Sequence, residues 1–169
     1  KTIDNKDILN NVLKASASRC SSELERVTYE NTLQEQALLY KALVENLPGF
    51  VYRCANDRDW TMQYLSPQFE SITGYKPDEV LNNKVLSFND IIHPDYQDYL
   101  WYKWQQVMEN KGIFEDEYII ITKDGREIIV WERGQGVYDN KGNLICLEGV
   151  IADITERKES EKELKFTQK

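Results

Sequence analysis

Residues 1–47 contain no proline and no glycine, and Pro48 and Gly49 follow them directly. A stretch of this length without either residue favours one long helix, and the Pro-Gly pair cannot continue it. Apolar side chains recur here at steps of three and four, which places them on one stripe of an otherwise polar rod. The stripe begins at Leu9 and continues through the candidate dimer-seam residues Leu13, Ala17, Cys20, Leu24 and Val27.

This stripe needs a partner, because the segment has nothing of its own to cover it. We expect a second copy of the chain, which predicts a homodimer formed through the N-terminal helix. The alternative is that the helix folds back onto its own domain. Asn31 and Gln34 interrupt the stripe before Leu38, which predicts either a break between two helices or a polar layer that sets the register of a coiled coil.

Short strands and helices are predicted after the Pro-Gly pair. Residues 50–55 and 60–65 are expected to form two strands of a hairpin around the turn 56–59. Three helices are expected over 66–75, 76–83 and 93–112. For the first of them, Ser66 is the candidate N-cap, Pro67 the first helical position and Gly74 the closing residue.

The last third of the chain is expected to be strands, at 113–122, 126–138 and 143–154. The strands are separated by "KDG" at 123–125 and "DNKG" at 139–142, which are strong hairpin signals. Sequential hairpins pair these three strands directly, and the two early strands complete the sheet. The order predicts an α+β domain with its helices gathered on one face of an antiparallel sheet.

Composition excludes several classes of protein. The net charge of −8 and the pI near 4.8 repel nucleic acid and anionic lipid. No run reaches the ~20 apolar residues of a membrane span, and no leader pattern opens the chain. Three widely spaced cysteines argue against a disulfide framework and a metal site, and fit a reducing cytoplasm. Because residue 1 is lysine, we expect a piece of a larger protein.

Five segments in order resemble the signatures of a PAS domain of the bacterial sensor subtype with a C-terminal PAC motif. They are "NLPGFVYR", "YLSPQFESITGY", "IIHPD", "KDGREIIVWERGQGVYDNKGN" and "LEGVIADITERK", and the resemblance covers about residues 39–158. It implies a five-stranded antiparallel sheet with small helices on one face and a cavity between them. It also implies an N-terminal helical, coiled-coil-like linker at 1–38, a PAS domain at 39–155 and a C-terminal signalling helix at 156–169.

The resemblance implies a cytoplasmic sensory and dimerisation module of a signal-transduction protein, and not an enzyme. Its output domain would be one such as a histidine kinase or a diguanylate cyclase in the same chain. The signal would pass through the junction Asp153, Ile154 and Thr155, where the last strand ends and a helix begins. The alternative is a constitutive dimerisation spacer without a ligand.

A small-molecule pocket is expected between the sheet and the helices, although the same residues could be an ordinary core without a void. Alternation and the layout of the family give its candidate lining as Tyr52, Tyr64, Phe69, Ile72, Tyr75, Ile92, Trp104, Tyr118, Ile120, Val130 and Leu147.

No cofactor, metal or catalytic residue is predicted. His93, the sole histidine, stands before Pro94 at a helix start, so a structural cap is favoured over haem ligation. Relatives that bind flavin covalently carry a helical cysteine, whereas Cys54 and Cys146 fall on predicted strands and read as core residues. Residues 115–117 are acidic and are expected to form a solvated face.

Overall fold

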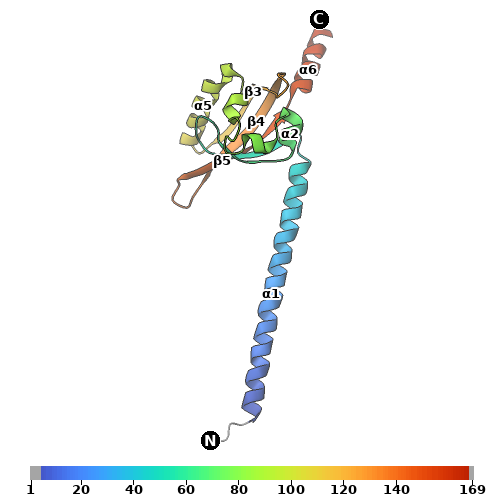
Figure 1. The fold of residues 1–169 in the computed structure, drawn as a ribbon, viewed down its shortest axis with the longest axis vertical. Coiled ribbons are helices and arrows are strands. Elements are labelled where there is room, and N and C mark those ends of the chain that lie inside the picture. The colour runs from blue at the N-terminus through green and yellow to red at the C-terminus, as the bar shows by residue number, and fades with distance from the viewer. Residues whose placement is uncertain (1–4, 168–169) are drawn as a thin grey trace. The chain divides into compact units, whose positions relative to one another are not determined.

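The computed structural model describes residues 5–167 of the chain, and its elements are labelled in Figure 1. The described chain divides into two compact units, one that extends to Leu43 and one that starts at Val44. The first unit consists of a single helix, α1 (Asn5–Glu45), which runs on at its end into the second unit. The break between two helices that Asn31 and Gln34 allowed is therefore absent from α1.

The predicted seam residues of α1 are all exposed in the single chain. Leu13, Leu24 and Val27 are 58%, 69% and 41% exposed. Ala17 and Cys20 are exposed as well. An apolar stripe in contact with water is what a helix shows before it meets a partner, and the homodimer stays a prediction.

The second unit is built on one sheet of five antiparallel strands, as predicted. The strands are β1 (Gly49–Cys54), β2 (Met62–Leu65), β3 (Ile113–Ile121), β4 (Glu127–Tyr138) and β5 (Leu144–Asp153). Their order in the sheet is β2-β1-β5-β4-β3. The three late strands pair in succession and the early hairpin adds to β5, so the predicted pairing and the α+β fold class are confirmed.

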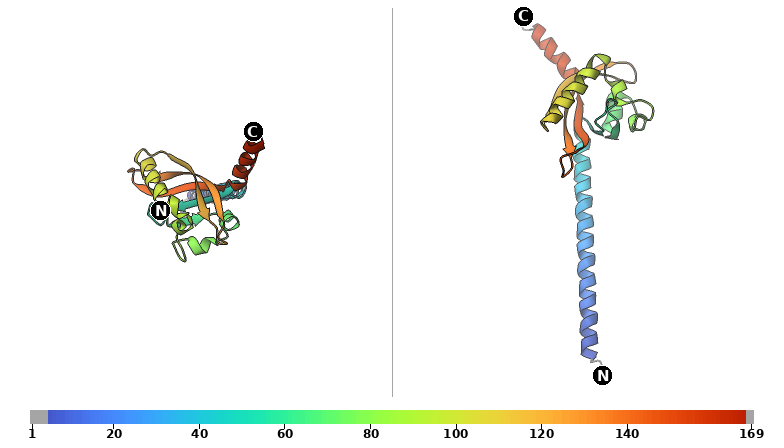
Figure 2. Two further views of the ribbon diagram at one scale, coloured as in Figure 1. Left: turned by 90° about the horizontal axis from the view of Figure 1, so that it is seen from above. Right: turned by 90° about the vertical axis from the view of Figure 1, so that its left-hand side faces the viewer.

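Four helices follow β2 and gather on one side of the sheet (Figure 2). They are α2 (Gln68–Thr73), α3 (Pro77–Val80), α4 (Phe88–Ile91) and α5 (Pro94–Glu109). The sequence did not predict α4, a single turn that begins where the Ser87 hydroxyl accepts from the Asp90 N–H. Gly74 closes α2 with a left-handed φ of 79°, as predicted.

Ser66 was wrongly predicted to cap α2. The residue before α2 is Pro67, and no side chain caps this helix. The Ser66 hydroxyl instead accepts from the Val51 N–H at 3.0 Å, and the Ser66 N–H donates to the Val51 carbonyl at 2.9 Å. The serine thus extends the pairing of β2 with β1 by one residue, because a strand amide competes for its hydroxyl.

The core lies between the sheet and the helices. Phe50 on β1 meets the Phe69 ring of α2 edge to face, with the ring centroids 5.0 Å apart. Trp104 of α5 stacks on Phe114 of β3 with the centroids 4.5 Å apart. Full burial of such a side chain contributes about 1.5–3 kcal/mol, so these aromatic pairs fix α2 and α5 over the sheet.

Candidate functional site

A small cavity lies between the inner face of the sheet and helices α4 and α5. The space open to the centre of a water-sized sphere is about 10 Å³, which is about the room that one water molecule needs. Its walls are mostly aromatic and aliphatic, and one of them is acidic. The lining residues are Tyr52, Cys54, Trp60, Met62, Phe88, Ile92, Leu100, Trp104, Tyr118, Glu132, Leu147 and Ile151.

Apart from Tyr64, the predicted pocket residues either line the cavity or belong to the core around it. Those that line the cavity are Tyr52, Ile92, Trp104, Tyr118 and Leu147. The others belong to the surrounding core: Phe69, Ile120 and Val130 are buried, and Ile72 and Tyr75 are partly buried against it. The sequence therefore identified the face of the sheet that lines the cavity. For the helical wall it named mainly residues in and just after α2, whereas the structure uses α4 and α5.

Tyr64 does not line the cavity, which corrects the prediction. Its side chain is 43% exposed, and on β2 the buried residues are Met62 and Leu65. In the register of the hairpin, Tyr64 lies opposite Arg53 and Leu65 lies opposite Tyr52. Strict alternation would put Tyr64 on the face of Met62, but the pairing shifts by one residue between Arg53 and Cys54. Tyr64 therefore lies on the outer face with Arg53.

Glu132 is the residue of this cavity that sequence reasoning missed. It lies on β4 with only 4% of its surface exposed. The Tyr118 hydroxyl donates to its Oε2 atom at 2.7 Å, and the Tyr52 hydroxyl donates to its Oε1 atom. Ile128, Val130 and Glu132 have the same parity on the strand, so strict alternation would have placed the acid on the buried face.

Burial raises the pKa of Glu132 to about 7. Loss of water around the carboxylate is the main cause, and Asp116 adds to it. Hydrogen bonds from Tyr52, Tyr118 and Trp104 favour the ionised form and lower the pKa, but they offset the burial only in part. This carboxyl therefore changes charge near neutral pH, inside the cavity.

The two tyrosines keep their protons over the same range. Burial, in the first place, and then the charge of Glu132 hold the pKa of Tyr52 and of Tyr118 well above the usual value. Each hydroxyl therefore stays a donor to Glu132 and retains oxygen lone pairs that can accept.

Two glycines on neighbouring strands make room for Tyr52. Gly134 of β4 and Gly149 of β5 face each other in the sheet. A Cβ atom at Gly134 would lie 2.6 Å from the Tyr52 hydroxyl oxygen, and one at Gly149 would lie 2.7 Å from it. The Tyr52 ring can reach Glu132 only because both positions lack a side chain.

The histidine and the cysteines were also assigned roles from the sequence. His93 is the N-cap of α5, where its Nδ1 atom accepts from the Asp95 N–H at 3.3 Å. Cys54 is buried and lines the cavity, Cys146 is buried, and Cys20 is exposed. The side chains that the structure describes include no group of three or more acidic, histidine or cysteine residues that could hold a metal ion.

The junction at Asp153–Thr155 connects β5 to helix α6 (Thr155–Thr167). The Asp153 Oδ1 atom accepts from the Thr155 N–H at 2.9 Å, and also from the Thr155 hydroxyl at 2.6 Å. Ile154 is 8% exposed. Asp153 is thus the acceptor at the helix start, whereas Thr155 uses its hydroxyl elsewhere.

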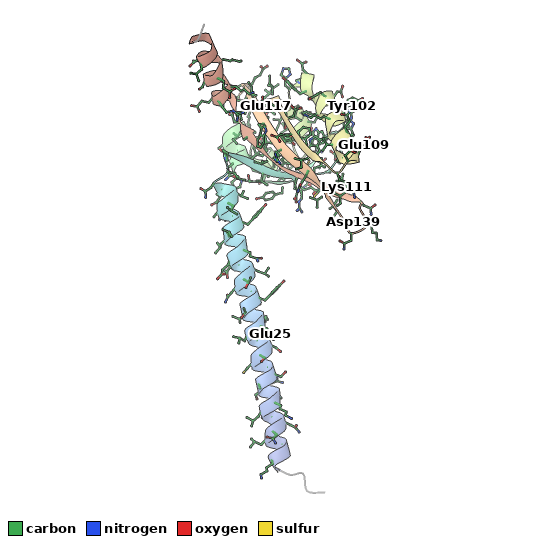
Figure 3. All side chains as sticks on the ribbon, turned by 180° about the vertical axis from the view of Figure 1, so that it is seen from behind. Glu25, Tyr102, Glu109, Lys111, Glu117 and Asp139 are labelled. Atoms are coloured by element: carbon green, nitrogen blue, oxygen red, sulfur yellow. The ribbon has the colours of Figure 1, made fainter. Side chains whose placement is uncertain are left out.

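The start of α6 is bonded to the sheet through one residue of β4, the strand next to the edge strand β3. The Thr155 hydroxyl oxygen accepts from the Ile129 N–H at 2.9 Å, and the Ile154 N–H donates to the Ile129 carbonyl at 2.9 Å. In the next turn of the helix, Lys158 Nζ lies 2.5 Å from Oε2 of Glu117 on β3. Glu117, labelled in Figure 3, belongs to the edge strand of the sheet, so α6 is attached to two strands besides its own.

The second unit is thus an α+β module in which helices close a small chamber over one face of an antiparallel sheet. A sequence model described as the PAS fold matches residues 62–151, more than half of the chain. The chain belongs to the PAS family.

Several proteins similar to this chain are described as sensors. It is 31% identical over 122 residues to a methyl sulfide methyltransferase-associated sensor of Methanosarcina acetivorans, and the match covers 72% of this chain and 12% of the relative. A sensory box histidine kinase/response regulator from Burkholderia thailandensis is similar with 25% identity and a TM-score of 0.60, over 76% of this chain and 94% of that one.

The N-terminal domain of a diguanylate cyclase with a PAS/PAC sensor from Marinobacter aquaeolei is similar in fold. Its identity is 19% and its TM-score 0.53, over 64% of this chain and 97% of that chain. Among the described residues, no helix combines the length and the apolar composition that crossing a membrane requires.

Proposed function

We propose that this chain is the cytoplasmic PAS sensory and dimerisation module of a larger signal-transduction protein. It binds a small molecule in its cavity and passes the change to α6 and then to an output domain, such as a histidine kinase or a diguanylate cyclase. The module itself carries out no reaction. The match to a sensor of which this chain spans only 12%, and to PAS domains of a kinase and a cyclase, supports this placement.

The attachment of α6 to Ile129 is the observation that carries the proposal. Both backbone groups of this β4 residue are bonded to the start of the outgoing helix, one to Ile154 just before it and one to its first residue, Thr155. Glu132 lies three positions further along the same strand, in the wall of the cavity. A shift of β4 at Glu132 would therefore move the hydrogen-bond partners of Ile154 and Thr155, since a hydrogen-bonded strand moves largely as one body.

Amide hydrogen exchange of the purified chain tests this coupling. Exchange in α6 is measured for the wild type and for Glu132→Gln, which alters the cavity alone, and again in a Thr155→Val background. We expect Glu132→Gln to change the exchange of α6 in the wild-type background. This change should be lost or much reduced with Thr155→Val, because the valine cannot accept from the Ile129 N–H.

Thr32→Val is the matched control, since the Thr32 hydroxyl is exposed on α1 and bonds only within its own helix, to the Thr28 carbonyl. It should leave the response of α6 intact. If hydrogen exchange in α6 is the same in the wild type and in Glu132→Gln, the proposed route is contradicted.

The dimer part of the proposal rests on the exposed stripe of α1. Leu13, Leu24 and Val27 present apolar surface at helical spacing, which a parallel copy of the helix would cover. Two such helices would join two PAS modules and so bring two output domains together.

A constitutive dimerisation spacer is the second candidate. The small size of the cavity favours it, since about 10 Å³ leaves room for no more than one water unless side chains move. Native mass spectrometry of the purified protein, with thermal-shift screening of small molecules, separates the two. A bound or stabilising compound supports the sensor, and a chain that none of them stabilises supports the spacer.

A further inference from the structure

Glu132 is a buried acid whose hydrogen-bond donors are all neutral. The groups that act most on it are Tyr52, Tyr118, Trp104 and Asp116, and none of them carries a positive charge. They come from β1, β3 and α5, and the strand that pairs with β4 at Glu132, β5, places the apolar Ile151 opposite it. Burial of an ionised carboxylate is costly unless a cation compensates it, so this site is electrostatically incomplete when the carboxyl is charged.

The cavity next to this carboxyl offers both kinds of contact that an organic cation uses. An ionised carboxylate has about four acceptor positions, and the hydrogen bonds from the Tyr52 and Tyr118 hydroxyls leave others for a ligand. The hydroxyl oxygens of Tyr52 and Tyr118 can accept further N–H groups. The rings of Trp60, Trp104 and Phe88 also line the cavity, and aromatic rings attract cations.

We propose that the cavity binds a small ammonium-type cation, the ammonium ion itself or a primary methylammonium, with Glu132 as its counter-ion and Tyr52 and Tyr118 as its further acceptors. This inference rests on the sensory function proposed above and names the class of its ligand.

The lining selects against other ligands. An anion would meet a buried carboxyl with no cation beside it, so anionic metabolites are disfavoured. Hard metal ions need six or more oxygen ligands, whereas the cavity provides one carboxylate and two phenol oxygens among apolar walls. An ammonium group, by contrast, needs only a few hydrogen-bond acceptors and packs favourably against aromatic rings.

The volume sets the size of the cation. Space for about one water fits an ammonium ion, and each added methyl group requires a side chain to move. Met62 lines the cavity, and its flexible side chain can repack around one methyl. A quaternary cation such as tetramethylammonium exceeds this room and lacks the N–H donors.

Thermal unfolding of the purified chain at about pH 8 tests the site, because Glu132 is then largely ionised. The melting temperature is followed in ammonium, methylammonium, potassium and tetramethylammonium chloride at equal ionic strength. We expect ammonium and methylammonium to raise the melting temperature saturably and by more than potassium does. Tetramethylammonium should raise it no more than potassium does. The fluorescence of Trp60 and Trp104 should change with the same concentration dependence, since both line the cavity.

Two variants and a control make the result specific. Glu132→Gln should abolish both the ammonium-specific rise in melting temperature and the fluorescence change. Tyr118→Phe should weaken both, and it tests the site independently if Glu132→Gln does not fold. Glu115→Gln, on the exposed carboxylate that pairs with Arg133, should respond as the wild type does. Equal responses to ammonium and potassium, or a response retained in Glu132→Gln, would overturn the assignment.

Failure of this experiment is distinguishable from failure of the proposed function. Cation binding is read from melting and from tryptophan fluorescence, whereas coupling is read from hydrogen exchange in α6. A chain that ignores ammonium but still transmits Glu132→Gln to α6 is a PAS sensor for another ligand.

Discussion

The proton on Glu132 should make the stability of this protein depend on pH in an unusual direction. Its pKa is about 7 in the folded protein against 4.5 in the ordinary state. Each pH unit between these two values is worth about 1.36 kcal/mol, so the whole interval is worth roughly 3 kcal/mol. Because the folded state binds this proton more tightly than the unfolded state does, the contribution is fully present below about pH 4.5. It decreases as pH rises and is lost above about pH 7.

Glu132→Gln removes this titration while keeping the size of the side chain. The free energy of unfolding is measured by urea denaturation from about pH 4.5 to 8, for the wild type and the variant. Across that range the difference between them should shift by roughly 3 kcal/mol in favour of the variant. Acids with lowered pKa values, such as Asp116, Asp124 and Asp139, titrate in both proteins and cancel in the difference.

The neighbours of Glu132 do not confuse this result. Tyr52, Tyr118 and Cys54 all have raised pKa values, so they stay protonated throughout. Two stability curves that run parallel from acid to neutral pH would refute the reasoning, since they would mean that Glu132 ionises as an exposed acid does.

Three other substitutions probe the remaining features. Leu24→Glu should shift the protein toward monomer in analytical ultracentrifugation with the circular dichroism of the sheet unchanged, and an undiminished dimer would locate the interface elsewhere. Asp153→Ala should lower the free energy of unfolding by about 1 kcal/mol, the usual cost of a lost helix cap, while weakening output in the full-length protein. Gly134→Ala should cost about 1–3 kcal/mol in urea denaturation, because its Cβ would lie 2.6 Å from the Tyr52 hydroxyl oxygen. Gly112→Ala, whose Cβ would meet nothing closer than 3.4 Å, is the control, and equal losses would show that crowding at Tyr52 is not the cause.

The strands and their pairing were predictable because their signals are local. Alternation along β4 and β5 and the turns "KDG" and "DNKG" set both hairpins before any tertiary contact is considered. The helix α4 was missed because four residues are too few for helical periodicity to show, and it lacks the proline that marks the start of α3, a helix of the same length. Ser66 was misassigned because a strand amide and a helix N-terminus compete for the same kind of hydroxyl.

The cavity was only half predictable for a different reason. An acidic residue on a strand is normally expected on the face exposed to solvent. Glu132 is instead held inside by a hydrogen bond from Tyr52, which lies 80 residues away in the sequence. The alternation of β4 contained the signal, but the hydroxyl donors that make burial tolerable come from strands whose register no local pattern fixes. Tyr64 shows the same limit, since a change of one position in the register exchanges the two faces of β2.

The facing glycines of β4 and β5 leave the sheet bare where Tyr52 crosses it. On the opposite side of Gly134 and Gly149 lies a surface groove, whose rim includes Val51, Arg133 and Val150. Chamber and exterior are therefore separated at this point by a single layer of peptide groups. A partner that binds in the outer groove here would contact the backbone that lies directly against Tyr52, with no side chain of Gly134 or Gly149 between them.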